Sequence, residues 1–195
     1  AAESRIKSFS EASEMKSEQA RMDAAVREIK KIEWLREDQW GKCDSYQRKA
    51  ALRRACDALS NAYDCPSAPV DFYALPEDRT SRELGEYKDG DGNFIIKLNE
   101  DFLASDFNDP QLALKTLCHE YRHCYQFEMA ERYRKRMLMD TIANKEEVSA
   151  WMKNLAPGNY HAAGDGFSDY ERQPVEHDSR ELGEAICRRV YGSKI

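Results

Sequence analysis

The stretch His119-Glu120-Tyr121-Arg122-His123 has the pattern H-E-x-x-H. Residues four apart on an α-helix face the same side, so both imidazoles can reach one metal ion. Glu120 lies about 100° around the helix from His119 and about 60° from His123, so it borders the same pocket without competing for the metal. A carboxylate in that position can accept a proton from a metal-activated water. The motif therefore predicts a zinc site with His119 and His123 as ligands and Glu120 as the catalytic base.

The sequence around the motif predicts one long helix with an apolar face. Pro110 suits a first helical turn, and the helical pattern extends to about Asp140. Two imidazoles and a carboxylate on such a face would lose hydration without compensation, which favours a metal site over a surface helix with incidental histidines. The residues that share or widen this face are Leu112, Ala113, Thr116, Leu117, Cys124, Phe127 and Ala130.

Composition restricts the class of protein. The chain has 195 residues, 34% of them charged, and a formal net charge of −6, which predicts one ordinary domain, with or without a helical extension. This balance argues against nucleic acid or an anionic membrane as the main partner, and the lack of a long apolar run argues against membrane insertion. Because the sequence begins Ala1-Ala2-Glu3, we expect a processed product or a domain of a longer protein.

The six cysteines leave two alternatives open. An even count is compatible with disulfides in an oxidising compartment, and it favours an exported protein weakly. The absence of any C-x-x-C pair argues against a separate cysteine zinc site. Cys118 and Cys124, which flank the two histidines, could instead be small core residues.

Residues 1–64 read as an N-terminal helical segment, and residues 65–195 as the domain that carries the motif. The pattern predicts helices over Ser13–Trp40 and Ser45–Tyr63, neither of which contains a chemical motif. A helical scaffold is the simplest interpretation of this segment. The boundary falls where Cys65-Pro66-Ser67-Ala68-Pro69 ends the second helix.

A short β section follows the boundary. Strands are predicted over Val70–Ala74, Leu84–Tyr87 and Asn93–Leu98, the last two joined as a hairpin by residues 88–92. The fold class is therefore α+β and predominantly helical, with a small antiparallel sheet beside the motif helix.

The turn between the last two strands has some features of a calcium-binding loop. Asp89, Asp91, Asn93 and Glu100 occupy loop positions 1, 3, 5 and 12 of that pattern. However, Phe94 stands where the sharp turn requires glycine, and the flanking segments look like strands. The hairpin interpretation is therefore preferred.

The third metal ligand is expected downstream of the motif. Helix is predicted over Asn144–Asn154 and again over Pro174–Tyr191, with a loop between them that includes residues 156–160 and 164–168. A catalytic zinc site needs three protein ligands. Glu176, His177 and Asp178, at the start of the last helix, could each be the third.

At these residues the chain resembles the gluzincin branch of the zincin metallopeptidases. In that branch a later helix supplies a glutamate, often within Glu-x-x-Ala, and Glu176-His177-Asp178-Ser179 is similar to that pattern. The resemblance implies zinc held by His119, His123 and Glu176, with Asp178 ranked second and His177 third as the last ligand. It also implies that Phe94–Leu98 is an antiparallel edge strand along which a peptide substrate pairs.

The string H-E-Y-R-H-C-Y-Q from His119 to Gln126, with Gln173-Pro-Val-Glu176, is similar to small peptidase domains of bacterial polymorphic toxins and secreted effectors. The resemblance covers about residues 70–190. It implies a secreted or delivered metallopeptidase, with a protein or peptide as substrate and an inhibitor or immunity protein as a further partner; a cytoplasmic location remains an alternative.

The chain departs from better-known relatives in two respects. No third histidine follows the motif closely, which excludes the metzincin layout, and Arg180 stands where an aspartate would follow Glu176 by four residues. Asp178 is therefore a candidate for orienting a ligating histidine.

An oxyanion stabiliser is also expected, for which Tyr160, His161 and Tyr170 are candidates in the loop that leads to the last helix. Two other functions remain open. One is a zinc-dependent amidohydrolase that acts on a non-peptide or side-chain amide, since the same water activation would serve it. The other is a non-enzymatic helical binding module with a structural metal or none.

Overall fold

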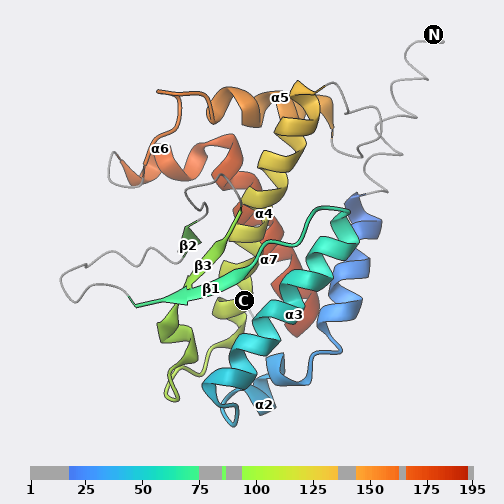
Figure 1. Cartoon of the computed structure of the whole chain (residues 1–195), viewed down its shortest axis with the longest axis vertical. Coiled ribbons are helices and arrows are strands. Elements are labelled where there is room, and N and C mark those ends of the chain that lie inside the picture. The colour runs from blue at the N-terminus through green and yellow to red at the C-terminus, as the bar shows by residue number, and fades with distance from the viewer. Residues whose placement is uncertain (1–17, 75–84, 87–93, 136–143, 163–165, 193–195) are drawn as a thin grey trace.

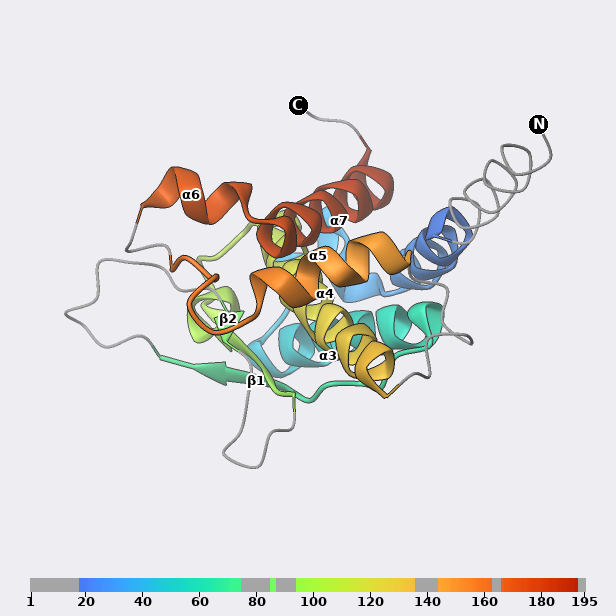
Figure 2. The same ribbon diagram turned by 90° about the horizontal axis from the view of Figure 1, so that it is seen from above.

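The computed structural model describes residues 18–74, 85–86, 94–135, 144–162 and 166–192. Helices dominate these residues, as the sequence predicted, and a small sheet lies beside them (Figure 1). The helix α4 (Pro110–Arg134), which carries the H-E-x-x-H motif, is central: seen from above, it lies between α3 (Ser45–Tyr63) and α7 (Pro174–Tyr191) (Figure 2). The candidate site is therefore built on a helix that packs between two others.

The N-terminal helices are shorter than predicted. The expected helix Ser13–Trp40 is wrong within the described residues, because the helix over 18–29 ends in a turn that is followed by η1 (Glu33–Leu35) and α2 (Glu37–Trp40). The break turns the buried Leu35 and Trp40 into the core, and Trp40 Nε1 donates to the carbonyl of Phe107 at 3.0 Å. Helix α3 has the predicted bounds, and Asp44 begins it with a capping box.

The sheet has three short strands in the order β1-β3-β2, with β1 at Val70–Tyr73, β2 at Gly85–Glu86 and β3 at Ile96–Asn99. The prediction of an antiparallel sheet is wrong for β1 and β3, which pair in parallel, whereas β2 and β3 pair antiparallel. Hydrophobic alternation predicts which face of a strand is buried, but not the direction of its neighbour.

The prediction that Phe94–Leu98 contains an edge strand is also wrong. Strand β3 is the middle strand, because it pairs with β1 on one side and, at Lys97 and Leu98, with β2 on the other. At Lys97 and Leu98, a peptide therefore has no free edge of β3 along which to pair. The turn over residues 88–92 and three positions of the rejected calcium loop, Asp89, Asp91 and Asn93, lie outside the described residues.

Three further helices complete the fold. A short 3₁₀ segment, η2 (Glu100–Leu103), leads to α4, and α5 (Lys145–Asn154) and α7 begin within one residue of the predicted helix starts. Residues 164–168 were expected to be loop, but α6 (Phe167–Arg172) begins within them. The predicted end of the motif helix at Asp140 lies outside the described residues.

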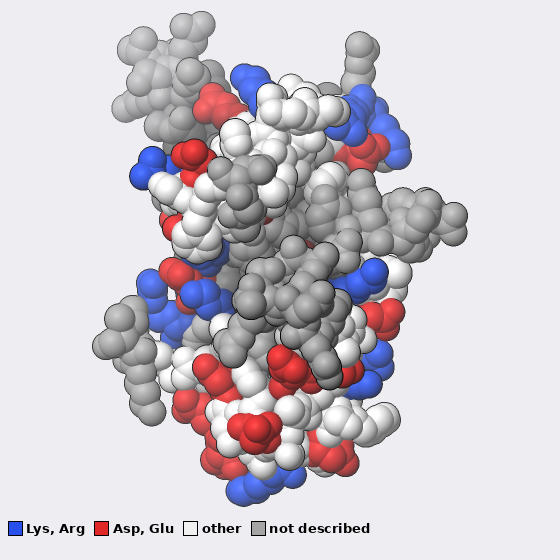
Figure 3. All heavy atoms as spheres, turned by 90° about the vertical axis from the view of Figure 1, so that its left-hand side faces the viewer, with Lys and Arg blue, Asp and Glu red and all other residues white. Residues whose placement is uncertain are grey.

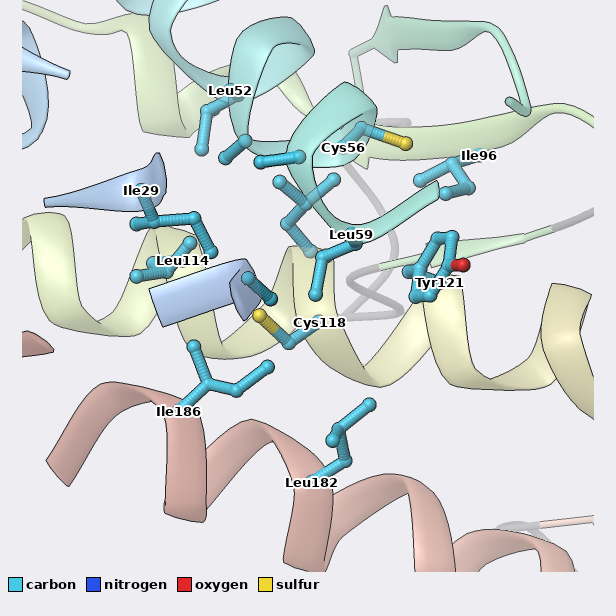
Figure 4. Packing of buried hydrophobic residues seen from close by; sticks show 14 of the residues in the cluster. Ile29, Leu52, Cys56, Leu59, Ile96, Leu114, Cys118, Tyr121, Leu182 and Ile186 are labelled. Carbon is cyan, nitrogen blue, oxygen red and sulfur yellow. The ribbon is translucent and has the colours of Figure 1, made fainter. Parts of the chain in front are cut away.

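One hydrophobic core joins the two predicted segments. Figure 4 shows Ile29 and Leu59, from the N-terminal segment, beside Leu114 of α4 and Ile186 of α7. Helix α7 approaches α4 closely at Gly183, where an added Cβ would lie only 2.9 Å from the carbonyl oxygen of Lys115. The N-terminal helices are thus part of the packing that holds α4 in place.

The six cysteines are all free and buried, so the core interpretation of Cys118 and Cys124 is confirmed. Cys118 immediately precedes His119, yet its side chain lies among the apolar residues between the helices (Figure 4). On the face shown in Figure 3, basic and acidic side chains are both present. Among the described residues, no helix combines the length and the apolar character that crossing a membrane requires.

Candidate metal centre

Two elements bring the candidate ligands together. His119 and His123 lie one turn apart on α4, and Glu176 lies in the first turn of α7, which packs along α4. The nitrogen atoms Nε2 of the two histidines are 3.1 Å apart, and Glu176 oxygens lie 3.2 Å from Nε2 of His119 and 3.5 Å from Nε2 of His123. Zinc bonded tetrahedrally at about 2.0–2.1 Å separates its ligand atoms by roughly 3.3 Å, so these spacings suit one ion.

The carboxylate of Glu176 provides an independent test of whether a cation fits. Its side chain is 2% exposed, and Oε2 is buried without a hydrogen-bond partner among the described residues, although it lies 3.2 Å from Nε2 of His119. An orphaned buried carboxylate oxygen is costly, and a metal ion would satisfy it. His119, His123 and Glu176 can therefore hold a metal ion.

The carboxylates of the site and the His123 imidazole shift one another's pKa values. Burial would raise the pKa of Glu176, but the close approach of the His119 and His123 imidazoles outweighs it, so the pKa lies well below its ordinary value. Burial would lower the pKa of His123, but the carboxylates of Glu176 and Glu120 raise it above 6.5. An ionised carboxylate beside two imidazoles is a ligand set that suits zinc.

Glu120 lies beside this group without joining it. Its side chain is buried, and burial raises its pKa, while the two histidines lower it and Glu176 raises it. A carboxylate whose pKa is raised by burial beside candidate metal ligands is a candidate for proton transfer.

The structure separates the three candidates for the third ligand. Glu176 meets both histidines, as ranked first. His177 faces outward, with its side chain 58% exposed and Nδ1 3.6 Å from Glu181. Asp178 instead pairs with Arg122 and accepts a hydrogen bond from Gln126, so neither alternative reaches the group.

The candidate oxyanion residues have different positions. The Tyr160 hydroxyl donates to Oε1 of Glu176 at 2.8 Å, and the ring of Tyr170 meets the ring of Tyr160 edge to face. Tyr160 thus contacts a candidate ligand, and Tyr170 packs against Tyr160. His161 is exposed, and its backbone is held by the side chain of Gln173.

The sequence analysis assigned no role to the residues that contact Nδ1 of His123, on the side of the ring away from the ligand group. Nδ1 of His123 lies 3.0 Å from Oε1 of Gln126 and 3.3 Å from the Ser179 hydroxyl. Gln126 follows His123 by three residues, so helical spacing alone places it on the same face and could have identified it. The role of Arg122 had no such signal, because its partner Asp178 is on another helix.

Comparison with known proteins does not extend this description. No family model matches the chain, and neither a characterised protein nor a solved structure with significant similarity was found. The relation to zincins therefore stays a prediction that depends on the motif residues and their geometry.

Proposed function

We propose that this chain is a zinc-dependent metallopeptidase of the zincin kind, which hydrolyses peptide bonds with His119, His123 and Glu176 as metal ligands. The observation that carries the proposal is the meeting of these three side chains next to a buried glutamate, Glu120, from the same helical turn. A purely structural metal site has no use for a carboxylate beside its ligands, whereas a hydrolytic site needs one.

In the proposed reaction, the metal and Glu120 would have separate roles. Zinc, when bound, lowers the pKa of a water molecule and polarises a carbonyl group. Glu120 would accept the proton of the attacking water and pass it to the leaving amine. The raised pKa of Glu120 supports this role, because a base with a pKa nearer neutrality can both take and return a proton.

The resemblance to toxin and effector domains supports a secreted or delivered protein that acts on a protein or peptide, with an inhibitor or immunity protein as a further partner. The sheet restricts how that substrate lies. Because β3 is paired on both sides at Lys97 and Leu98, the substrate would approach by another surface than the β3 edge.

The experiment that tests the proposal is the metal content of the purified chain, measured by elemental mass spectrometry without chelators or a nickel column. We expect about one zinc per chain, in line with the one three-residue group found among the described residues. The double variant His119→Ala/His123→Ala should lose it, and the matched variant His161→Ala/His177→Ala should keep it. Hydrolysis of a quenched-fluorescent peptide library by the zinc-loaded protein should follow the same pattern.

Two results would overturn the proposal. One is a chain that retains no zinc even after zinc is added back. The other is a zinc-loaded chain that cleaves no member of the peptide library, which would leave a metal site without peptidase activity.

A further inference from the structure

The side chain of Gln126 has only one chemically consistent orientation. It is fully buried, and one end of its amide lies 2.9 Å from the carbonyl oxygen of Val175 and 2.7 Å from Oδ2 of Asp178. A carbonyl and a carboxylate can only accept hydrogen bonds, so the amide nitrogen must face them. The amide oxygen of Gln126 therefore faces His123.

That orientation determines which nitrogen of His123 carries the proton. Oε1 of Gln126 lies 3.0 Å from Nδ1 of His123 and can only accept, so Nδ1 must donate. In the neutral imidazole, Nε2 then carries no proton, and its lone pair is directed towards His119 and Glu176. The hydroxyl of Ser179, 3.3 Å from Nδ1, can donate or accept and so does not alter this conclusion.

Asp178 is in turn held by a buried arginine. Arg122 Nε lies 2.8 Å from Oδ2 of Asp178, and Nη2 lies 2.9 Å from Oδ1, a bidentate pair with the Arg122 side chain 6% exposed. The guanidinium lies against the rings of Tyr63, Tyr125 and Trp151, and Nη1 reaches Oε1 of Glu18 at 3.2 Å. A buried ion pair seldom adds net stability over apolar packing, so fixing a geometry is its better explanation.

We propose that Arg122, Asp178 and Gln126 form a buried hydrogen-bonded relay that fixes His123 with its proton on Nδ1 and so keeps Nε2 available for metal. Arg122 orients the Asp178 carboxylate, and this carboxylate orients the Gln126 amide together with the carbonyl of Val175. The amide in turn orients the His123 ring. These are positioning residues, since none of them is a member of the ligand group, and only Gln126 contacts it, through His123. The zinc-affinity part of this inference depends on the proposed function, whereas the tautomer part does not.

The test reads the tautomer directly in the metal-free protein. Long-range proton–nitrogen correlation spectra of the nitrogen-15-labelled chain resolve imidazole tautomers, and the chain has only four histidines. At a pH where all four are neutral, His123, assigned from the spectrum of a His123→Gln variant, should be a single Nδ1–H form. Gln126→Leu should give a mixture of tautomers. Gln111→Leu, the same change near the start of α4, should leave the single form intact.

Zinc affinity, measured by competition with a chelating indicator, should fall in Gln126→Leu by about 10- to 100-fold, the usual effect of removing a partner of a ligating histidine. Asp178→Asn, which is nearly isosteric, should change the His123 tautomer and the zinc affinity in the same direction as Gln126→Leu does. It replaces Gln126→Leu as the test if that variant does not fold. Thermal unfolding of each metal-free variant shows whether the fold is retained.

The outcomes separate the two proposals. An Nε2–H form of His123 in the unaltered chain would overturn the relay. So would folded variants of Gln126 and Asp178 that keep the single Nδ1–H form and bind zinc within twofold of the unaltered chain. If the Nδ1–H form and its loss in the variants are observed but no chain binds zinc, the relay stands and the proposed function fails.

Discussion

Glu120 and Glu176 are two buried carboxylates at one site whose pKa values are displaced in opposite directions. Burial acts on both, but oxygens of Glu176 lie 3.2 Å from Nε2 of His119 and 3.5 Å from Nε2 of His123, whereas Glu120 gains only the longer-range attraction of the two histidines. Carboxylates whose environments separate their pKa values in this way commonly have separate roles, which supports the proposed roles of Glu176 as a ligand and Glu120 as a base.

At this scale, Glu120→Gln should keep the fold and the zinc but lose peptide hydrolysis. The amide has the same size as the carboxylate but cannot take a proton, and a general base typically contributes about 10²- to 10⁴-fold to the rate. Zinc content by elemental mass spectrometry and kcat/KM on a peptide substrate are the measurements. Glu131→Gln, on the same helix with a 43% exposed side chain, is the matched control and should retain activity. Full activity in Glu120→Gln would exclude Glu120 as the base.

The sequence predicts the helical part of the candidate site but not the side chains that surround it. His119, Glu120 and His123 lie within one helical turn, so their spacing alone predicts their common face. Glu176 was ranked first only through the resemblance to gluzincins, because Asp178 and His177 are equally capable ligands by chemistry. The relay could not be predicted, because the pair of Arg122 with Asp178 depends on how α4 and α7 pack.

Among the elements, the contact between α4 and α7 determines whether a site forms at all. The histidines and Glu176 come from different helices, and Gly183 allows those helices to approach until an added Cβ would lie 2.9 Å from the Lys115 carbonyl oxygen. The Lys115 carbonyl belongs to the backbone and cannot move away as a flexible side chain can. A distance of 2.9 Å from its oxygen therefore leaves no room for a methyl group at position 183.

Gly183→Ala should therefore lower the free energy of unfolding. Overpacking typically costs about 1–3 kcal/mol, which exceeds the gain of about 1 kcal/mol that alanine brings to a helix interior. Urea unfolding of the metal-free protein measures the difference. Gly41→Ala is the control, because its new Cβ would meet the end of the Asn108 side chain at 3.1 Å, which can move. If Gly183→Ala proved as stable as the unaltered chain, the helices would be further apart than described here.

Element prediction succeeded where local signals were strong. Helices α3 and α7 begin and end where the sequence predicts, with Asp44 as a capping residue and Pro174 in a first turn. It failed at residues 30–36, where no glycine or proline marks the break and only the burial of Leu35 and Trp40 explains it. The parallel pairing of β1 with β3 likewise depends on tertiary contacts that alternation does not encode.

Considered as a whole molecule, the fold and the metal site should stabilise one another. The ligands meet only when α4 and α7 are packed, and an ion that binds the folded state alone adds stability by mass action. Zinc at about a thousandfold above its Kd should add about 4 kcal/mol, which corresponds to a rise in Tm of roughly 10 °C for a chain of this size.

This stabilisation should shrink as the pH falls, because zinc binds the neutral imidazole and must compete with protons. The pKa of His123 is raised above 6.5, so the competition begins at a higher pH than for an ordinary histidine. Differential scanning calorimetry with zinc and with a chelator, from about pH 8 down to about pH 6, measures it. The variant His123→Ala should show little shift at any pH, and an equal shift there would place the binding elsewhere.

The burial of all six thiols has a practical consequence for studying this chain. Burial raises the pKa of Cys56, Cys65 and Cys187 to about 12 and those of Cys118 and Cys124 well above 9, so the reactive thiolate is scarce while the fold is intact. Alkylating reagents should then modify these positions only when the helices separate. The rate of modification, followed by mass spectrometry, thus measures how fast the core opens. No label has to be introduced into the chain.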